Sequence, residues 1–192
     1  MKNVVFIIGI LVVSGCDSKI VELLMEGQSV HKTAPGAKIA ATPTWYKTKD
    51  MAATLQFPKG WYENTDEHPY ELQCHSELRN MTTGVFVYQM VDLSNDYTPR
   101  KLLDYQINDL MSKRKNTGVV EKETTFKDEG KTITQVVYSG DKGVSKHYYV
   151  FSLIEFGKPE LPVLVTIQVA VPSQWKKSKD VLVDIIRSAK LL

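Results

Sequence analysis

Apolar and polar positions divide the chain into three parts with different patterns. Val4 to Val13 form an unbroken apolar run, residues 17–50 follow no sustained period, and residues 51–192 repeat with the periods of strands and helices. This division predicts a leader at 1–15, a tether at 16–50 and one globular domain at 51–192.

Strand-like alternation recurs through the predicted domain. The runs lie at 51–57, 70–78, 84–91, 119–126, 131–138, 146–156 and 161–171. Turn-forming residues separate the last four runs, at Asp128-Glu-Gly130, Gly140-Asp-Lys-Gly143 and Gly157-Lys-Pro159. Such short connections join antiparallel neighbours. The runs at 146–156 and 161–171 are apolar on both faces, which indicates central strands that are covered on both sides.

Two amphipathic helices are predicted beside these strands. Thr98 is a candidate N-cap, Pro99 suits the first helical position, and helical spacing continues for about 17 residues, to Asn116. A last helix begins at Pro172-Ser173. Its apolar face is formed by Leu182, Ile185, Ile186 and Ala189. The sequence therefore predicts the α+β class, as an α/β/α sandwich with a mainly antiparallel sheet of about six to seven strands between amphipathic helices.

The leader has the features of a bacterial lipoprotein signal. Lys2 precedes the apolar run, which closes on Val13-Ser14-Gly15-Cys16. About ten apolar residues are half of the ~20 that a bilayer-spanning helix needs, so a cleaved signal peptide at 1–15 is favoured over a permanent anchor. Cys16 would then begin the mature chain and carry diacylglycerol and an N-linked acyl chain such as palmitate, which together attach a protein stably to a membrane.

Asp17, directly after Cys16, resembles the sorting signal that keeps lipoproteins of enteric bacteria in the inner membrane. The expected location is therefore the periplasmic face of the inner membrane, with the outer membrane as the alternative. A flexible tether over 16–50 would span roughly 30 Å and hold the domain clear of the lipid headgroups. Part of this segment could pack on the domain instead, through Trp45 and Tyr46.

The net charge and the two cysteines limit the kinds of partner and the reactive groups that can be expected. A formal net charge of +2 gives no electrostatic reason to expect nucleic acid. Removing the leader leaves 177 of the 192 residues, enough for one core. Because Cys16 is committed to lipid, Cys74 has no disulfide partner and is expected to be a small buried side chain.

Residues with metal-binding or catalytic spacing are scarce. The four histidines are spread over positions 31, 68, 75 and 147, and no zinc-ligand motif is present. His75 and Glu77 share a predicted strand face but are too few to hold a metal. Tyr138-Ser139-Gly140 lacks the first half of a nucleophile elbow. We therefore expect no catalytic residue, no metal and no cofactor, and we do not expect an enzyme.

Three lysines occupy an unfavourable position in the last helix. Lys176, Lys177 and Lys179 fall in its first two turns, where the helix dipole disfavours cations by some tenths of a kcal/mol each. Either they form a solvated face, or they contact an anionic partner such as lipid headgroups or an acidic protein surface. The second hypothesis predicts that changing all three to glutamate leaves stability equal or slightly higher and weakens attachment of that partner.

In the order of its elements the chain resembles the DcrB-like lipoproteins of the PsbP-like superfamily. The specific points are Phe57-Pro58-Lys59-Gly60-Trp61 at the start of the fold, Val165-Thr-Ile-Gln-Val-Ala-Val-Pro172 before the last helix, and Ile185-Ile186-Arg187-Ser188 at its end. The resemblance covers nearly all of the domain. It implies an α/β/α sandwich, a non-enzymatic role and function through binding, with Trp61 as a packed aromatic. Cytosolic chaperones share this fold, but the signal peptide distinguishes this chain from them.

Together these patterns predict a membrane-anchored periplasmic lipoprotein that acts as a non-catalytic binding, scaffold or chaperone-like factor in the cell envelope. Its expected partners are the membrane, through lipid on Cys16, and an unidentified envelope protein, while the oligomeric state stays open. The alternative is a periplasmic immunity or inhibitor protein against a toxin or hydrolase. A small-ligand carrier is less favoured, because the sequence shows no convergent polar groups.

Overall fold

The computed structural model describes residues 37–77, 80–93 and 96–192. The predicted signal peptide, Cys16, Asp17 and the first part of the predicted tether lie outside these residues. Among the helices of the described ranges, none is long and apolar enough to cross a membrane.

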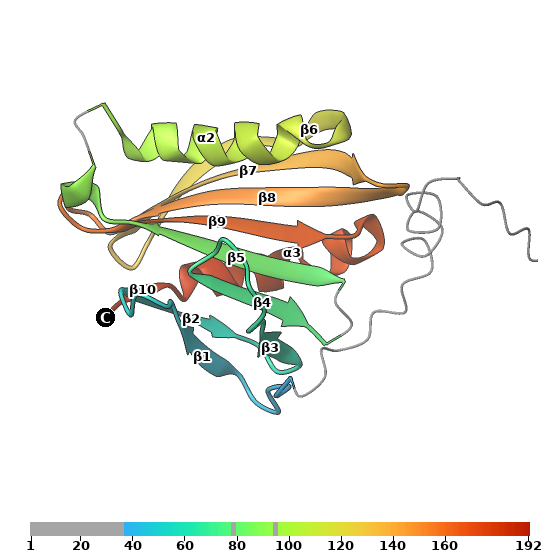
Figure 1. Ribbon diagram of the computed structural model, residues 1–192, viewed down its shortest axis with the longest axis horizontal. Coiled ribbons are helices and arrows are strands. Elements are labelled where there is room, and N and C mark those ends of the chain that lie inside the picture. Colours follow the sequence, from blue (N-terminus) through green and yellow to red (C-terminus); the bar gives the residue numbers. More distant parts are fainter. Residues whose placement is uncertain (1–36, 78–79, 94–95) are drawn as a thin grey trace, which may run out of the picture.

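The described strands form two antiparallel sheets (Figure 1). The larger sheet has seven strands in the order β3–β4–β5–β9–β8–β7–β6. These strands are β3 (Trp61–Glu63), β4 (Leu72–Ser76), β5 (Met81–Tyr88), β6 (Lys115–Asp128), β7 (Lys131–Lys142), β8 (Ser145–Glu155) and β9 (Val163–Ala170). The smaller sheet has the order β1–β2–β10 and consists of β1 (Thr44–Lys47), β2 (Ala53–Phe57) and β10 (Lys190–Leu191).

The path of the chain explains the order of the strands. After β5 the chain passes through the 3-10 helix η1 (Met90–Asp92) and the helix α2 (Pro99–Ser112) to reach the edge strand β6. It returns through consecutive hairpins from β6 to β9. Strand β9 then pairs with β5 over eight residues, from Ala170 opposite Met81 to Val163 opposite Tyr88. Segments far apart in the sequence therefore become neighbours at the centre of the sheet.

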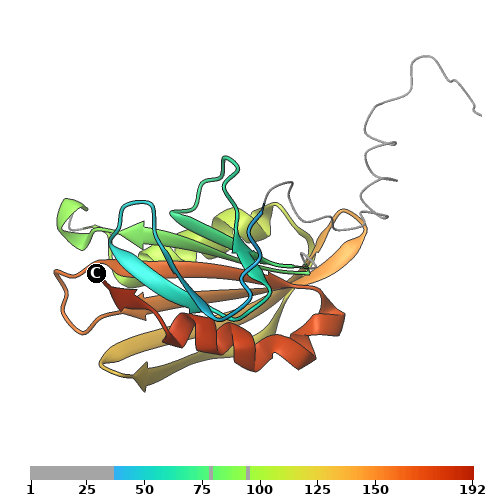
Figure 2. The same cartoon turned by 90° about the horizontal axis from the view of Figure 1, so that it is seen from below.

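One helix covers each face of the large sheet, as the two-sided apolar strands predicted (Figures 1 and 2). Side chains alternate along β8: Phe151 belongs to the same buried cluster as Leu103 of α2, and Val150 belongs to the same buried cluster as Leu182 of α3 (Pro172–Arg187). The small sheet lies on the α3 face, where Phe57 joins the same cluster of buried residues. The predicted α+β sandwich and its mainly antiparallel sheet are thus confirmed, and the three-stranded sheet is an addition to them.

The ends of α2 follow local chemistry. The Thr98 side chain accepts a hydrogen bond from the Lys101 backbone N–H at 3.3 Å, and Pro99 occupies the first turn, as predicted. The helix ends at Ser112 rather than near Asn116, because its C-cap Lys113 leaves the helical conformation at ψ 6°, and Asn116 then takes a φ of 50° outside the right-handed helical region. The chain is already in β6 from Lys115.

Residues assigned to the predicted tether form part of the fold. Thr44–Lys47 pairs with β2, so the regular structure begins before the predicted domain boundary at 51. The Tyr46 ring meets the Phe57 ring edge-on at a centroid distance of 5.7 Å, whereas Trp45 remains 42% exposed beneath the Lys190 ammonium group. Packing of this segment on the domain, which the sequence left open as an alternative, is found for Tyr46, whereas the contact of the Trp45 ring is with the surface residue Lys190.

The two edges of the large sheet are built differently. Strand β3 forms one edge with only three residues. Strand β6 forms the other with 14 residues, but its register against β7 shifts between Lys115 and Gly118, between Val119 and Glu121, and between Glu121 and Thr124. These irregularities interrupt an otherwise long edge strand.

Candidate functional site

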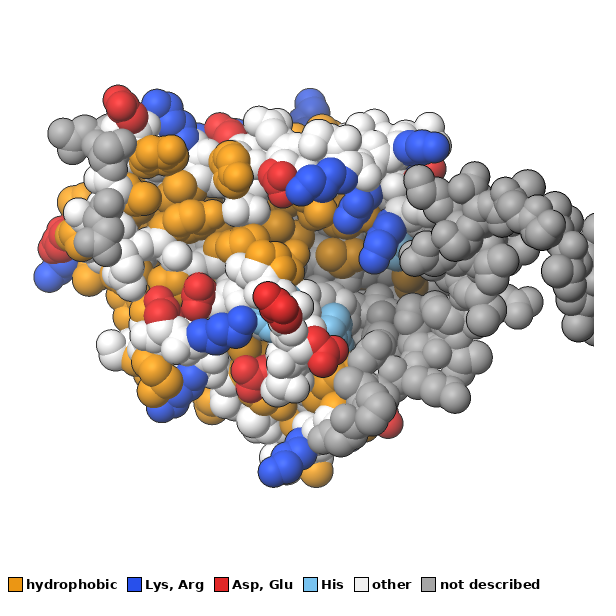
Figure 3. Space-filling model, viewed as in Figure 1, with side chains coloured by type: hydrophobic (Ala, Val, Ile, Leu, Met, Phe, Trp, Pro, Cys, Tyr) orange, Lys and Arg blue, Asp and Glu red, His pale blue; other side chains and the backbone are white. Residues whose placement is uncertain are grey.

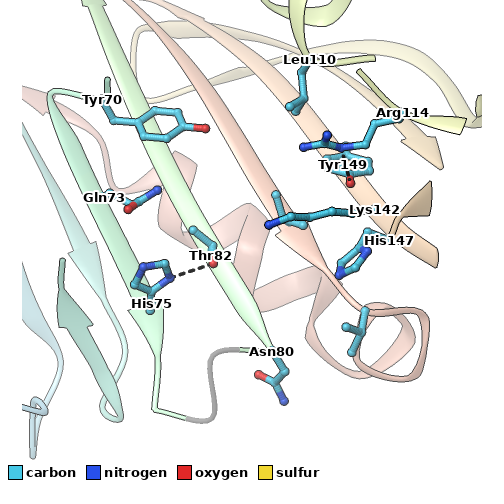
Figure 4. A pocket seen from close by; sticks show the side chains of 12 residues that line it. Tyr70, Gln73, His75, Asn80, Thr82, Leu110, Arg114, Lys142, His147 and Tyr149 are labelled. Atoms are coloured by element: carbon cyan, nitrogen blue, oxygen red, sulfur yellow. Dashed lines mark hydrogen bonds between the residues drawn. The ribbon is translucent and has the colours of Figure 1, made fainter. Parts of the chain in front are cut away.

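A cavity of about 300 Å³ opens on the α2 face of the large sheet, beyond the last turn of α2. Its lining side chains come from β4, β5, β7, β8 and β9, from the last turn of α2, and from the connecting residues Tyr70, Asn80, Arg114 and Val171. Figure 3 shows this face hollowed below α2, with Lys or Arg side chains on one side of the hollow and histidine on the other. Figure 4 shows the labelled lining side chains.

Arg114 enters the cavity from the turn that ends α2. Its backbone N–H donates to the Met111 carbonyl at 3.1 Å, and its side-chain Nε donates to the Tyr149 hydroxyl oxygen at 2.8 Å. The guanidinium carbon also lies 5.5 Å from the centroid of the Tyr149 ring. These contacts hold the guanidinium group in one direction, which Figure 4 shows to be into the cavity.

Two glycines make room for the cavity walls. A Cβ atom at Gly140 would lie 3.0 Å from the Arg114 Cβ and 3.1 Å from the Met111 Cε, so glycine allows the end of α2 to approach β7. A Cβ atom at Gly84 would lie 2.4 Å from the Tyr70 ring, which rests directly on the β5 backbone. The approach at Gly84 leaves no room for a side chain, and the approach at Gly140 would have to widen by a few tenths of an ångström to admit one.

The hairpin between β7 and β8 contributes a second cation and an imidazole. Lys142, the last residue of β7, is exposed at the mouth and directs its ammonium group into the cavity (Figure 4). His147 Nδ1 donates to the Ser145 carbonyl at 3.0 Å. Burial lowers the pKa of His147; the Ser145 carbonyl opposes this change, and the charges of Lys142 and Arg114 reinforce it. His147 is therefore expected to be neutral near pH 7.

The opposite wall carries hydrogen-bonding groups. His75 Nδ1 lies 2.8 Å from the Thr82 hydroxyl oxygen, and the two residues are direct cross-strand partners in β4 and β5. Burial raises the pKa of both Tyr70 and Tyr149, although nearby Arg114 acts against it. Both phenols therefore keep their protons and can donate hydrogen bonds.

Two cations, Arg114 and Lys142, line the cavity, and the charges of Asp109 and Asp141 act on its tyrosines from outside the lining. The lining itself includes no Asp or Glu. Within the described residues, neither Arg114 nor Lys142 forms an ion pair, whereas the cations Arg100, Lys113, Lys131 and Lys179 all do. The arrangement can therefore bind a ligand through charge and several hydrogen bonds. The sequence did not indicate it, because its residues come from elements that only the strand order brings together.

The structure does not bring the residues singled out from the sequence into one site. Cys16 and Asp17 lie outside the described residues. Lys176 and Lys177 are exposed on α3, on the other face of the sheet from the cavity. Lys179 forms an ion pair with Glu121 of β6 at 2.6 Å and lies 5.7 Å from the centroid of the Trp175 ring.

Two single-residue predictions are confirmed. Cys74 is fully buried and free, and burial raises the pKa of its thiol well above the ordinary value, so the reactive thiolate is disfavoured. Trp61 is 3% exposed and packs against Phe57 with ring centroids 5.4 Å apart. In the described parts of the chain, no group of three or more His, Cys, Asp or Glu side chains is placed to hold a metal ion.

The ion pair of Lys179 changes the expected result of altering the three lysines. Replacing only Lys176 and Lys177 by glutamate should leave the free energy of unfolding equal or slightly higher, because exposed charges then agree with the helix dipole. Adding Lys179→Glu should lower that free energy by about 0.5–1 kcal/mol, because two carboxylates replace an exposed ion pair. Urea unfolding of the double and triple variants measures the difference. Equal stabilities would show that the pair with Glu121 contributes nothing.

The sequence matches no protein-family model and no curated protein. Solved structures do match. Cyanobacterial PsbP (CyanoP) from Synechocystis sp. PCC 6803 is 11% identical, with a TM-score of 0.58 over 83% of this chain and 98% of that chain. LpqN, described as involved in cell envelope biogenesis of Mycobacterium tuberculosis, is 12% identical, with a TM-score of 0.56 over 78% of this chain and 90% of that chain.

The Ran-binding protein Mog1p of Saccharomyces cerevisiae is also similar, at 12% identity and a TM-score of 0.51 over 79% of this chain and 96% of that chain. At such identities these likenesses establish the fold alone. The chain has a PsbP-like fold, as the sequence resemblance implied.

Proposed function

We propose that this protein is a non-catalytic binding lipoprotein of the DcrB-like group, anchored through lipid on Cys16 to the periplasmic face of the inner membrane. The apolar leader that closes on Cys16 supports the anchor, and Asp17 supports the choice of membrane. The PsbP-like fold is consistent with the DcrB-like group. In this proposal the cavity beside α2 binds a component of the cell envelope.

The observation that carries the proposal is the convergence of Arg114 and Lys142 on one cavity without carboxylate partners in the described chain. A cation that forms no ion pair within the protein is available to bind a negative charge on a partner. Within the lining, His75 Nδ1 lies 2.8 Å from the Thr82 hydroxyl oxygen, and the cross-strand register of the two residues accounts for that contact.

A photocrosslinking residue placed at Leu110 tests the proposal in intact cells. Leu110 lines the cavity from α2 and is partly exposed. The same residue placed at Lys176, on the opposite face, is the matched control. We expect one envelope component to be captured from position 110 and not from position 176. Capture from position 176 alone would assign binding to the α3 lysines and contradict the cavity.

The identity of the captured component separates the scaffold from the immunity alternative. A toxin or hydrolase that loses activity when bound would support an inhibitor and contradict the scaffold. The anchor is tested by Cys16→Ser, which should abolish incorporation of labelled palmitate and leave an uncleaved or mis-sorted precursor. Protein of mature size that still fractionates with membranes would contradict lipid attachment.

A further inference from the structure

We infer that the cavity binds a phosphate group, with Arg114 and Lys142 as its charged ligands and the Tyr149 hydroxyl as a third donor. The group could belong to a soluble phosphate ester or to the headgroup of a phospholipid, since both present the same chemistry. This inference rests on the proposed function and names the ligand class of its site.

Two cations that extend into one cavity indicate an anionic ligand. Some cations elsewhere in the described chain meet carboxylates at short range, as Lys113 does with Asp109 at 2.7 Å and Lys179 with Glu121 at 2.6 Å, whereas others, such as Lys176, stay exposed on the surface. Arg114 and Lys142 lack such partners and extend toward the same space (Figure 4). Because the lining has no carboxylate, an anion entering the cavity meets no like charge from the residues that line it.

The hydrogen bonds of Arg114 leave donors directed at the ligand. Nε is committed to the Tyr149 hydroxyl oxygen, and Nη1 donates to the Lys113 carbonyl at 3.1 Å. Three of the five guanidinium N–H donors therefore remain for another acceptor. Tyr149 accepts from Arg114, so its own hydroxyl proton can be donated to the ligand. Lys142 adds an ammonium group with three donors.

Donors that approach from several directions fit phosphate better than carboxylate. A phosphate monoester has three terminal oxygens arranged around phosphorus and a charge between −1 and −2 near neutral pH, whereas a carboxylate has two oxygens in one plane. Arg114 comes from the segment after α2, Tyr149 from β8, Lys142 from the end of β7, and Thr82 from β5 (Figure 4). Donors from four separate segments suit a group whose acceptor oxygens point in three directions.

The size of the cavity limits the rest of the ligand. A volume of about 300 Å³ is at the small end of ligand sites and has room for a phosphate and a few further heavy atoms. The amides of Gln73 and Asn80 can bond to hydroxyl groups, and Val169 offers apolar contact. A glycerol phosphate unit, free or as a headgroup, has these dimensions and groups.

Titration calorimetry on the full chain in a neutral detergent tests the inference, with glycerol 1-phosphate as the probe and succinate as the carboxylate control. We expect one binding site per chain for glycerol 1-phosphate. We expect succinate to bind with an affinity at least about tenfold lower. No binding of glycerol 1-phosphate in the millimolar range, or succinate binding of equal strength, would overturn the inference.

Two variants assign the binding to the cavity. Lys142→Gln should weaken glycerol 1-phosphate binding about tenfold. Lys146→Gln makes the same change four residues later, on an exposed side chain of the same hairpin that does not line the cavity, and should leave binding within about twofold. Equal losses in the two variants would show a general charge effect and overturn the site.

A short-chain lipid distinguishes the two sources of the phosphate. If the natural ligand is a headgroup, dihexanoyl phosphatidic acid should bind at least as tightly as glycerol 1-phosphate. If it is a soluble ester, the acyl chains should weaken binding about tenfold. Capture of an envelope component from position 110 without any phosphate binding would refute this inference and leave the proposed function standing. Failure of both experiments would refute both.

Discussion

Replacing Phe57 by alanine is expected to lower the free energy of unfolding by about 3–5 kcal/mol, the usual cost of truncating a buried phenylalanine. Phe57 is 0% exposed at the end of β2. Its ring lies between those of Tyr46 and Trp61, at centroid distances of 5.7 and 5.4 Å, and belongs to the buried cluster on the α3 face. Alanine would leave a cavity where the small sheet joins this cluster.

Urea unfolding followed by circular dichroism measures the loss. Trp45→Ala is a suitable control, because Trp45 lies on the neighbouring strand β1 but is 42% exposed, so its loss should be under about 1 kcal/mol. If Phe57→Ala cost no more than Trp45→Ala, the small sheet would not share the core of the large one.

Replacing Lys131 by methionine should lower the free energy of unfolding by about 2–3 kcal/mol, because hydrogen bonds from a charged donor are lost and their acceptors stay in place. Lys131 is 5% exposed at the start of β7. Its ammonium group donates to the Arg187 carbonyl and, at 3.1 Å, to the Ala189 carbonyl, both at the C-terminal end of α3. A cation there also complements the helix dipole.

Lys127→Met provides the comparison for Lys131. Lys127 lies on β6 opposite Thr132 and is exposed, so the same substitution should change stability by less than about 0.5 kcal/mol. Thermal unfolding of both variants gives the two values side by side. Similar small losses would mean that the Lys131 ammonium group does not hold the end of α3.

The longest elements could be predicted from the sequence because they contain several repeats of their period. Strands β7, β8 and β9 and both helices lie where alternation or helical spacing placed them, with shifts at their ends. Strands β1, β3 and β10 have four, three and two residues, too few for a period to show. Their pairing depends on partners supplied by the rest of the fold, such as β2 for β1.

The role of a side chain could be predicted from the sequence where it depends only on burial. It could not be predicted where it depends on a contact with a residue from a distant part of the chain. Cys74 was expected to be buried from its lack of a disulfide partner. The position of Lys179 on the last helix could also be predicted. Its ion pair with Glu121 could not, because it depends on where β6 lies at the edge of the large sheet. The cavity is the extreme case, because Arg114, Lys142 and His75 become neighbours only when β9 pairs with both β5 and β8.

The two edge strands of the large sheet, β3 and β6, affect how readily copies of the protein associate. An exposed strand edge offers unpaired N–H and C=O groups to any other strand, and so it invites aggregation by edge-to-edge addition. With three residues, β3 is too short to guide a second strand, and the register shifts of β6 break the regular spacing that such addition requires. Charged side chains such as Lys122 and Glu123 also stand exposed along β6. Both edges of the large sheet therefore disfavour edge-to-edge pairing between copies of the protein.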